Sequence, residues 1–351
     1  MALVDWIQNG VLENVDLSDQ QLEGANLSRI RIKGVSFRGA NLTGANFSEA
    51  EIKDCIFDDA NLTGANFQGT SSEKLNASRA LWSSARLVDS VWNTCCFDDG
   101  VIDQVDFSAS TINHCSFSNV RLLQSKLDVS TFNSCSFKAV DLSGTSMNRT
   151  TFMDCQMLGV NLSGNVLQQS IFLRTTLPGH SFSACTLQNT LFHESDLSGC
   201  NFEGLQLDGV FFAESNLKGS NFRRVNATEL NGALGDFSSS DWSDATLNLA
   251  DFRFANFEKT IFDRASINLT NFERAKAGQS SWRSSSLESI DFSYVVLDDS
   301  HFDQGNLHLC ILHRVSDLNV DWSLAKLKLC PKTDPEKAAA EDFKPDEPSQ
   351  G

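Results

Sequence analysis

Gly39-Ala40-Asn41-Leu42-Thr43-Gly44-Ala45-Asn46-Phe47 contains the pattern that decides the fold of this chain. A large apolar residue recurs every five positions, at Leu42 and Phe47, and a small residue stands two positions before each. The same pattern returns twenty residues later, at 59–67. Nearly every position ending in 2 or 7 is apolar from Leu12 to Leu327. A repeat that runs through the whole chain predicts one elongated solenoid rather than two globular domains.

The five-residue period fits neither the 3.6 of a helix nor the 2.0 of a flat strand. Gly, Asn, Asp and Ser stand between the apolar centres, and these residues tolerate tight turns. If four repeats close one square coil, residues twenty apart should stack in columns. The columns are homogeneous; one of them reads Phe132, Phe152, Phe172, Phe192, Phe212. We therefore expect an all-β parallel β-helix with four sides, about 16 coils and a length of about 77 Å, at ~4.8 Å per coil.

The repeats resemble those of pentapeptide-repeat proteins, whose consensus is A-(D/N)-L-x-x. The chain matches that consensus at Ala40-Asn41-Leu42, Ala60-Asn61-Leu62, Ala45-Asn46-Phe47, Ala250-Asp251-Phe252 and Ala255-Asn256-Phe257. The resemblance covers residues 12–327. It implies a right-handed quadrilateral parallel β-helix in which the apolar centre and the small residue two before it face inward. It implies no single function.

The pattern divides the chain into an N-terminal cap (1–11), the β-helix (12–330) and an acidic tail (331–351). Trp6 and Ile7 are expected on a short turn that covers the first coil, because an open solenoid end exposes unpaired strand edges. The charged, proline-containing tail is expected to be disordered, although Asp334 could cap a marginal helix from Pro335 to Phe343. Two segments, 68–79 and 227–235, depart from the pattern without losing phase and are predicted to be bulges or small loops.

Composition sets limits on location and partners. The net charge of −17 argues against direct nucleic-acid binding, which needs a positive surface, and allows a basic partner. No apolar run approaches the length of a membrane span, and the start of the chain lacks the features of a signal peptide. A bacterial cytoplasmic protein is the expectation, with secretion by a route without a cleaved signal left open.

Neither a catalytic nor a cofactor site is expected. All cysteines except Cys96 fall on the inward small-residue positions, and no C-x-x-C pair is present, so we expect buried thiols rather than a zinc site. The sequence also has no G-x-x-x-x-G-K loop for phosphate. An uninterrupted solenoid offers flat faces and a filled interior, whereas catalysis needs groups that converge in a concave site. The sequence therefore predicts neither enzyme activity, nor a cofactor, nor a metal.

The outward apolar residues are the main clue to function. Met153, Ile171, Leu173, Leu191 and Phe211 are predicted to stack on one face as a partner-binding patch. The alternatives are that a loop or the tail covers these residues, or that the face bends and leaves them half-buried. A second outward group is predicted to form a docking or dimer surface toward the C-terminal end: Leu234, Leu249, Phe254, Leu269, Tyr294 and Leu309.

Two functional hypotheses follow. The first is a non-catalytic interaction rod, acting as a scaffold, adaptor or secretion-associated accessory or effector protein, that binds a protein partner, with a homodimer left open. The second comes from the resemblance, because the best-known activity of the family is mimicry of B-form DNA in binding DNA gyrase or topoisomerase IV, as in the quinolone-resistance proteins. The acids that would serve it form two clusters: Asp58, Asp59, Asp98, Asp99 and Asp103, then Asp298, Asp299 and Asp303. Arginines between the clusters, such as Arg224 and Arg264, count against it.

Overall fold

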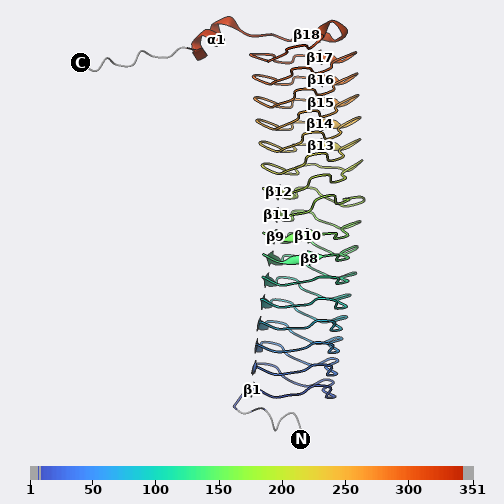
Figure 1. The fold of residues 1–351 in the computed structure, drawn as a ribbon, viewed down its shortest axis with the longest axis vertical. Helices are drawn as coiled ribbons and strands as arrows, with labels where there is room; N and C mark the ends of the chain where they lie inside the picture. The colour runs from blue at the N-terminus through green and yellow to red at the C-terminus, as the bar shows by residue number, and fades with distance from the viewer. Residues whose placement is uncertain (1–6, 8, 343–351) are drawn as a thin grey trace, which may run out of the picture.

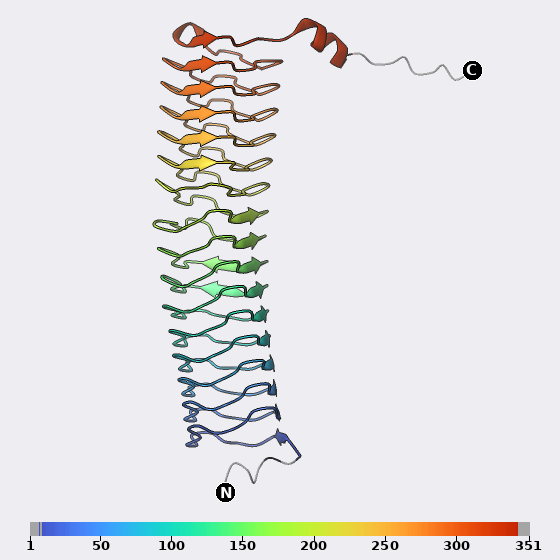
Figure 2. The ribbon, with the colours of Figure 1, turned by 180° about the vertical axis from the view of Figure 1, so that it is seen from behind.

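The chain forms a straight rod of stacked four-sided coils (Figures 1 and 2). The computed structural model describes residue 7 and residues 9–342. Each coil takes twenty residues, and the rod has about 16 turns. The predicted all-β parallel β-helix is thereby confirmed.

Each side of a coil pairs with the same side of the next coil. In one coil, Arg31 pairs with Glu51, Ser36 with Ile56, Asn41 with Asn61 and Asn46 with Asn66, all in parallel. Four pairing positions per twenty residues mean four sides, one for each five-residue repeat. Because the register never shifts, residues twenty apart stack directly above one another.

The paired segments are short, and they fall into three parallel sheets. The ten-stranded sheet contains β1 (Val11–Glu13), β2 (Arg31–Lys33), β3 (Glu51–Lys53), β4 (Ser71–Glu73), β5 (Val91–Asn93), β6 (Thr111–Asn113), β7 (Thr131–Asn133), β9 (Thr151–Met153), β11 (Ile171–Leu173) and β12 (Leu191–His193). The two-stranded sheet contains β8 (Ser136–Lys138) and β10 (Gln156–Leu158). The six-stranded sheet contains β13 (Asn226–Thr228), β14 (Thr246–Asn248), β15 (Ser266–Asn268), β16 (Ser286–Glu288), β17 (Asn306–His308) and β18 (Lys326–Lys328).

The side of the rod that carries the ten-stranded sheet will be called the β1 face. It continues beyond β12 through residues 211–213, 231–233, 251–253, 271–273, 291–293 and 311–313, which pair as isolated bridges. The six-stranded sheet starts five residues earlier in the repeat, at β13, and so lies on a neighbouring side. Figure 2 shows this change of side between β12 and β13.

The interior consists of stacked apolar columns. The rings of Phe152, Phe172 and Phe192 stack with centroids 5.1 and 4.9 Å apart, and all three side chains are fully buried. Offset stacking of this kind adds about 0.5–1.5 kcal/mol per pair to the burial of the rings. The column of identical residues is therefore a main source of stability along the rod.

Each repeat ends at a corner residue in the left-handed conformation. Residues numbered with a final 4 or 9 have positive φ, and many are not glycine, for example Asp54 at 53° and Leu249 at 55°. Asn, Asp and Gly adopt this conformation with little strain, whereas a leucine or phenylalanine there is unusual. The corner positions are thus where the sequence departs most from local preference.

The two segments expected to bulge, 68–79 and 227–235, do not bulge. Strands β4 and β13 continue the ladder through them without an inserted residue. The small buried Ser72 pairs with Trp92 of the next coil, whose buried ring lies 5.6 Å from that of Phe67. At Gly232 a Cβ would stand 2.7 Å from atoms of Phe237 and Phe252, so neighbouring rings occupy the place of the missing side chain. The backbone therefore keeps the regular coil at the small residues Ser72 and Gly232, and larger side chains pack beside them.

The ends of the rod differ from its middle. Ile7 packs partly buried against the core, whereas the rest of the proposed N-terminal cap before residue 9, including Trp6, lies outside the described residues. At the other end, the last coil is half-exposed and includes a short 3-10 helix, η2 (Trp322–Leu324), in which Trp322 Nε1 donates to Asp317.

Part of the tail expected to be disordered is helical. Residues Pro335–Asp342 form α1, which projects sideways from the C-terminal end of the rod (Figure 1). Asp334 caps it, because its carboxylate accepts the backbone N–H groups of Glu336 and Lys337 at 2.9 and 3.2 Å. Pro335 at the first helical position is also favourable. Residues 343–351 lie outside the described residues.

Candidate functional site

The first predicted group of outward apolar residues forms one continuous cluster on the β1 face. We call it the Ile171 patch, and its members are Met153, Ile171, Leu173, Leu191 and Phe211. Ile171 pairs with Leu191, and Leu191 with Phe211, so these three make one column. Met153 and Leu173 are paired in the second outward column of the same strands. The sequence therefore placed all five side chains correctly relative to one another.

The residues of the patch point outward because successive side chains of a strand alternate between its two sides. On β11, Phe172 points inward and is fully buried, so Ile171 and Leu173 on either side of it must point outward. Ile171 is 37% exposed, and the other four members are partly exposed. Ala213 and Ala233 follow Leu173 and His193 in the second column, so the surface stays flat beyond the patch. No part of the described chain covers the five residues.

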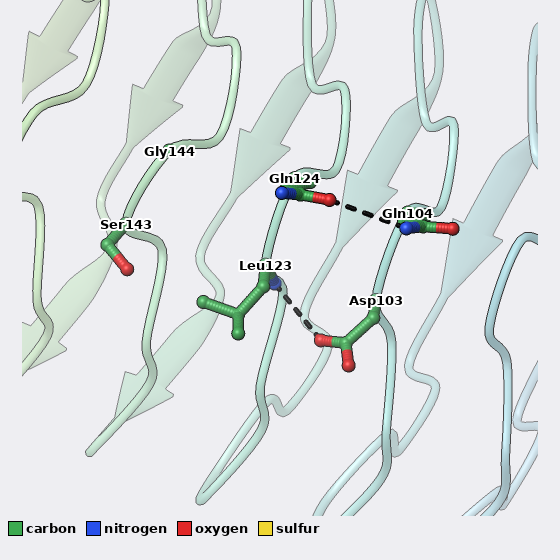
Figure 3. Close-up of a pocket in the computed structure, with 6 residues that line it drawn as sticks. All are labelled: Asp103, Gln104, Leu123, Gln124, Ser143 and Gly144. Carbon is green, nitrogen blue, oxygen red and sulfur yellow. Dashed lines mark hydrogen bonds between the residues drawn. The ribbon is translucent and has the colours of Figure 1, made fainter.

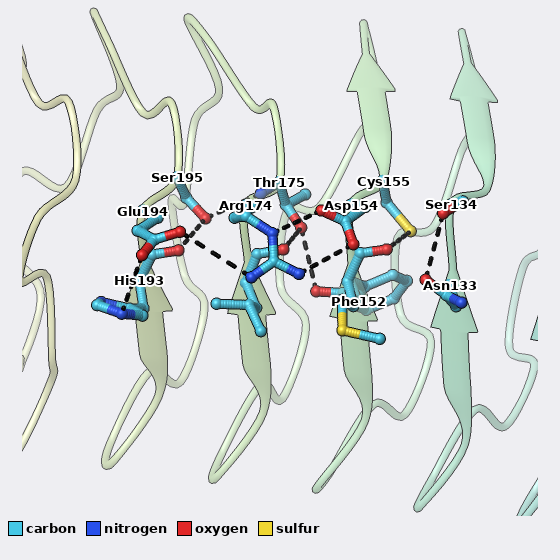
Figure 4. A network of polar contacts seen from close by, with 12 residues as sticks. Asn133, Ser134, Phe152, Asp154, Cys155, Arg174, Thr175, His193, Glu194 and Ser195 are labelled. Carbon is cyan, nitrogen blue, oxygen red and sulfur yellow. Dashed lines mark hydrogen bonds and ion pairs between the residues drawn. The ribbon is translucent and has the colours of Figure 1, made fainter.

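A ladder of charges runs along one side of the patch (Figure 4). Arg174 lies between Asp154 and Glu194 of the neighbouring coils, with Nε 2.7 Å from Asp154 and Nη1 3.9 Å from Glu194. The hydrogen bond from Arg174 lowers the pKa of Asp154 below its usual value. His193 joins the ladder to the patch, since its Nε2 lies 3.6 Å from Glu194 and its ring meets Phe211 edge-on at 5.9 Å. The patch thus has an apolar centre and an ordered polar border.

The second predicted group is not one surface. Leu249, Leu269 and Leu309 stack along one corner of the rod, and they are 47%, 51% and 45% exposed. Leu234, Phe254 and Tyr294 lie along the next corner. Charged and polar residues such as Arg253, which is paired with Asp251 at 2.7 Å, occupy the β1 face between the two corners. The structure therefore resolves the group into two narrow ridges.

The acids proposed for DNA mimicry are held by other parts of the rod. Asp58 and Asp98 accept backbone N–H groups twenty residues later, from Ser78 and Ser118. The remaining acids of the first cluster are paired with Arg79, Asn119 and Arg121. Asp298 accepts Leu318 N–H, Asp299 accepts from Asn319, and Asp303 accepts from Arg283. These carboxylates stabilise neighbouring coils, and Asp103 lies on a different side from Asp58 and Asp98.

One depression on the described surface is lined mainly by polar residues that are already hydrogen-bonded to one another. Its volume is about 430 Å³, and it is lined by Asp103, Gln104, Leu123, Gln124, Ser143 and Gly144 (Figure 3). Gln104 donates to Gln124 at 3.4 Å, and Leu123 N–H donates to Asp103 at 3.2 Å. The groups that could hold a ligand therefore bind one another.

Most of the cysteine thiols are buried in the core. Burial raises the pKa of Cys55 to about 11 and that of Cys200 to about 12, so both thiols are protonated at neutral pH and are poor nucleophiles. His180 is 5% exposed and its Nδ1 lies 2.9 Å from the carbonyl of Leu177. In the described residues there is no group of three or more metal-ligating side chains. The described part of the chain also contains no helix long and apolar enough to cross a membrane.

One cluster was missed by reasoning from the repeat. His313 occupies an outward position of the repeat, yet it is 3% exposed and contacts Glu341 of α1, as does Arg314 beside it. The cap at Asp334 was a usable signal for the helix. The place where the helix meets the rod was not predictable, because the tail does not follow the repeat.

Square coils, a twenty-residue register and a five-residue side together define the class of fold as a pentapeptide-repeat β-helix. Family models agree: "Pentapeptide repeat region" matches residues 145–222, and "Pentapeptide repeats (8 copies)" matches residues 30–69 and 236–268. The chain is therefore built of pentapeptide repeats over the residues that these models match. A search of curated proteins found no match.

Several solved structures resemble parts of the chain. A pentapeptide repeat protein from the Arabidopsis thaliana thylakoid lumen is 27% identical over 28% of this chain and 66% of its own, with a TM-score of 0.23. HetL, a pentapeptide repeat protein involved in heterocyst differentiation regulation in the cyanobacterium Nostoc, is 18% identical over 74% and 89%, with a TM-score of 0.21. QnrB1, a plasmid-mediated fluoroquinolone resistance protein, is 15% identical over 70% and 96%, with a TM-score of 0.25.

Proposed function

We propose that this protein is a non-catalytic interaction rod that binds a protein partner through the Ile171 patch. The role would be that of a scaffold, adaptor or secretion-associated accessory or effector protein. The observation that carries the proposal is the in-register apolar column of Ile171, Leu191 and Phe211 in three successive coils, on a face where other exposed apolar residues, such as Val91 and Ile311, stand singly. Exposed apolar clusters with a polar border usually mark protein contact sites.

The anatomy of this surface supports the proposal. Protein interfaces combine an apolar centre with a polar rim. The ladder of Asp154, Arg174 and Glu194 provides such a rim on one side of the patch. The patch lies on paired strand segments, and the ladder lies on the corner residues that follow them, whose backbone is hydrogen-bonded to the next coil at Asp154 and Arg174, so little backbone freedom would be lost on binding.

The size of the patch limits how much of a protein interface it can supply. From Met153 to Phe211 it spans three coil steps, about 14 Å at ~4.8 Å per step. An interface of standard size buries about 800 Å² on each partner. The patch therefore supplies the centre of the contact, and the charge ladder and the neighbouring coils supply its periphery.

DNA mimicry of the kind that binds a topoisomerase is the less well supported alternative. It needs acids free to meet the basic groups of a DNA-binding surface. Here the acids of both clusters are hydrogen-bonded within the rod, as Asp58 is by Arg38 and Ser78. Inhibition or protection of gyrase in a supercoiling assay at tens of micromolar protein would favour mimicry over the apolar contact.

The test is a triple variant, Ile171→Ser, Leu191→Ser and Phe211→Ser, used as bait in affinity capture from lysate of the source cells. We expect partners held by the unaltered chain to be lost, because three apolar side chains leave the centre of the contact. A matched control replaces exposed apolar residues elsewhere, Ile56→Ser, Leu81→Ser and Val91→Ser, which do not form one column.

The control variant should keep the partners. Both variants should keep the β-rich circular dichroism spectrum of the unaltered chain, since none of the six side chains is a core residue. If the patch variant captures every partner that the unaltered chain captures, the proposed function is wrong.

A further inference from the structure

Helix α1 is held to the rod by charged groups around Glu341. Glu341 Oε2 lies 3.1 Å from His313 Nε2 and 3.0 Å from Arg314 Nε. The neighbouring Asp342 Oδ2 lies 2.6 Å from Arg314 Nη2, and the same guanidinium donates to the carbonyl of Ala338 at 2.7 Å. No residue of α1 is buried. The contacts that hold α1 to the rod are therefore mainly polar.

The rod supplies a preformed half of this contact. His313 is 97% buried, and its Nδ1 accepts the backbone N–H of Asp334 at 3.3 Å. Because Nδ1 is an acceptor, the ring proton lies on Nε2 and points at the carboxylate. Tyr294 stands edge-on to His313 at 5.5 Å, and the guanidinium of Arg274 stacks over the Tyr294 ring at 4.8 Å. These side chains come from successive coils, so the β-helix fixes their spacing.

The site binds a carboxylate in its charged form. Hydrogen bonds from Tyr294 and His313 lower the pKa of Glu341 to about 2. The groups that face Glu341 are Tyr294, His313 and Arg314 on the rod and Lys337 on α1, whose Nζ lies 3.9 Å away. Every one of them is a hydrogen-bond donor or a cation.

We propose that Tyr294, His313 and Arg314 form a carboxylate-binding site for an acidic helical peptide of a partner protein, and that α1 occupies this site until the partner displaces it. The α1 half is exposed and charge-based, and such contacts are weak and are screened by salt. The rod half is rigid and partly buried, so it remains a receptor when α1 leaves. This site is separate from the Ile171 patch and does not depend on it.

The test measures binding of a labelled peptide with the sequence of residues 331–342 by fluorescence anisotropy. The receptor is the full chain carrying Glu341→Gln and Asp342→Asn, which neutralises its own α1. We expect this variant to bind the peptide at least about tenfold tighter than the unaltered chain does, with affinity falling at high salt. A peptide carrying the same two substitutions should bind at least about tenfold more weakly. Equal binding of the two peptides overturns the proposal.

Two further measurements test the same contact, and one of them uses the unaltered chain. Adding Tyr294→Phe to that variant should weaken peptide binding, because the phenol no longer donates to the carboxylate. In the unaltered chain, excess unlabelled peptide should speed hydrogen exchange at residues 336–342 as α1 is displaced. Unchanged exchange at saturating peptide would overturn the proposal by itself.

Discussion

At the scale of single residues, adjacent positions on one strand have opposite roles. Phe192 is fully buried in the aromatic column, whereas its neighbour Leu191 lies on the Ile171 patch. Successive residues of a β-strand point to opposite sides, so residues that stabilise the core alternate with residues that face a proposed partner. This separation makes it possible to change one property without the other.

The first prediction uses this pair. Phe192→Ala should cost about 3–5 kcal/mol, because it leaves a cavity between Phe172 and Phe212, whereas Leu191→Ser should cost less than about 1 kcal/mol. Guanidinium unfolding followed by circular dichroism gives the shift in midpoint for each variant. Similar shifts for the two would show that the inward and outward positions are assigned incorrectly.

A second residue-scale prediction concerns Tyr294. It is the only tyrosine of the chain, so its ionisation can be followed alone by ultraviolet absorbance. The hydrogen bond to Glu341 raises the pKa of Tyr294 above its usual value of 10.0. The Glu341→Gln variant should bring that pKa back down, because the neighbouring negative charge is gone. An identical titration curve in both chains would mean that α1 does not contact Tyr294 in solution.

At the scale of elements, salt bridges between corner residues connect one coil to the next. Arg29, Arg79, Arg174 and Arg264 each reach the acid twenty residues earlier or later, with shortest N–O distances between 2.7 and 3.0 Å. The four pairs are exposed, so each contributes little alone. Because such pairs repeat along the rod, together they make the stability of the rod depend on pH.

The pH dependence has a definite sign. Hydrogen bonds from arginine lower the pKa values of Glu49, Asp59, Asp154 and Asp244 from 4.5 for Glu and 3.8 for Asp. Their contribution to stability is present above these unfolded values and is lost as pH falls through the lower folded values. The melting temperature should therefore fall below about pH 4.

A variant separates the ladders from the general charge of the rod. With Asp59, Asp154 and Asp244 replaced by Asn, the fall in melting temperature between pH 5 and pH 3 should be smaller than in the unaltered chain. Calorimetry over that range measures both. Parallel curves for the two chains would show that these pairs do not contribute.

The elements also show how far the sequence can be interpreted. The coil, its register and the side of each residue followed from the apolar centres and small residues, because a closed solenoid leaves one inward direction. The bulges predicted around Ser72 and Gly232 were wrong, since large side chains of neighbouring residues pack beside these small residues and the backbone needs no inserted residue. The Ile171 patch was predictable because twenty-residue spacing is the register, whereas the contact of α1 with His313 was not, since the tail lies outside that register.

At the scale of the whole molecule, the rod presents distinct surfaces along one face. Mixed charges occupy the first strands, at Arg31 and Glu51, and small polar residues follow at Thr111 and Thr131. The Ile171 patch comes next, and charged residues return after it. Outward apolar residues in three successive coils thus distinguish this level of the β1 face.

The most direct test of this account is a photo-crosslinking scan of the β1 face. A photoreactive amino acid placed singly at positions 51, 111, 131, 171, 191 and 211 samples different coils on one side of the rod. Irradiation of source cells, followed by mass spectrometry, reports the protein trapped at each position. The account predicts that one protein partner is trapped at 171, 191 and 211 and not at 51 or 111. Trapping that is equal at all six positions, or absent at 171, 191 and 211, would contradict it.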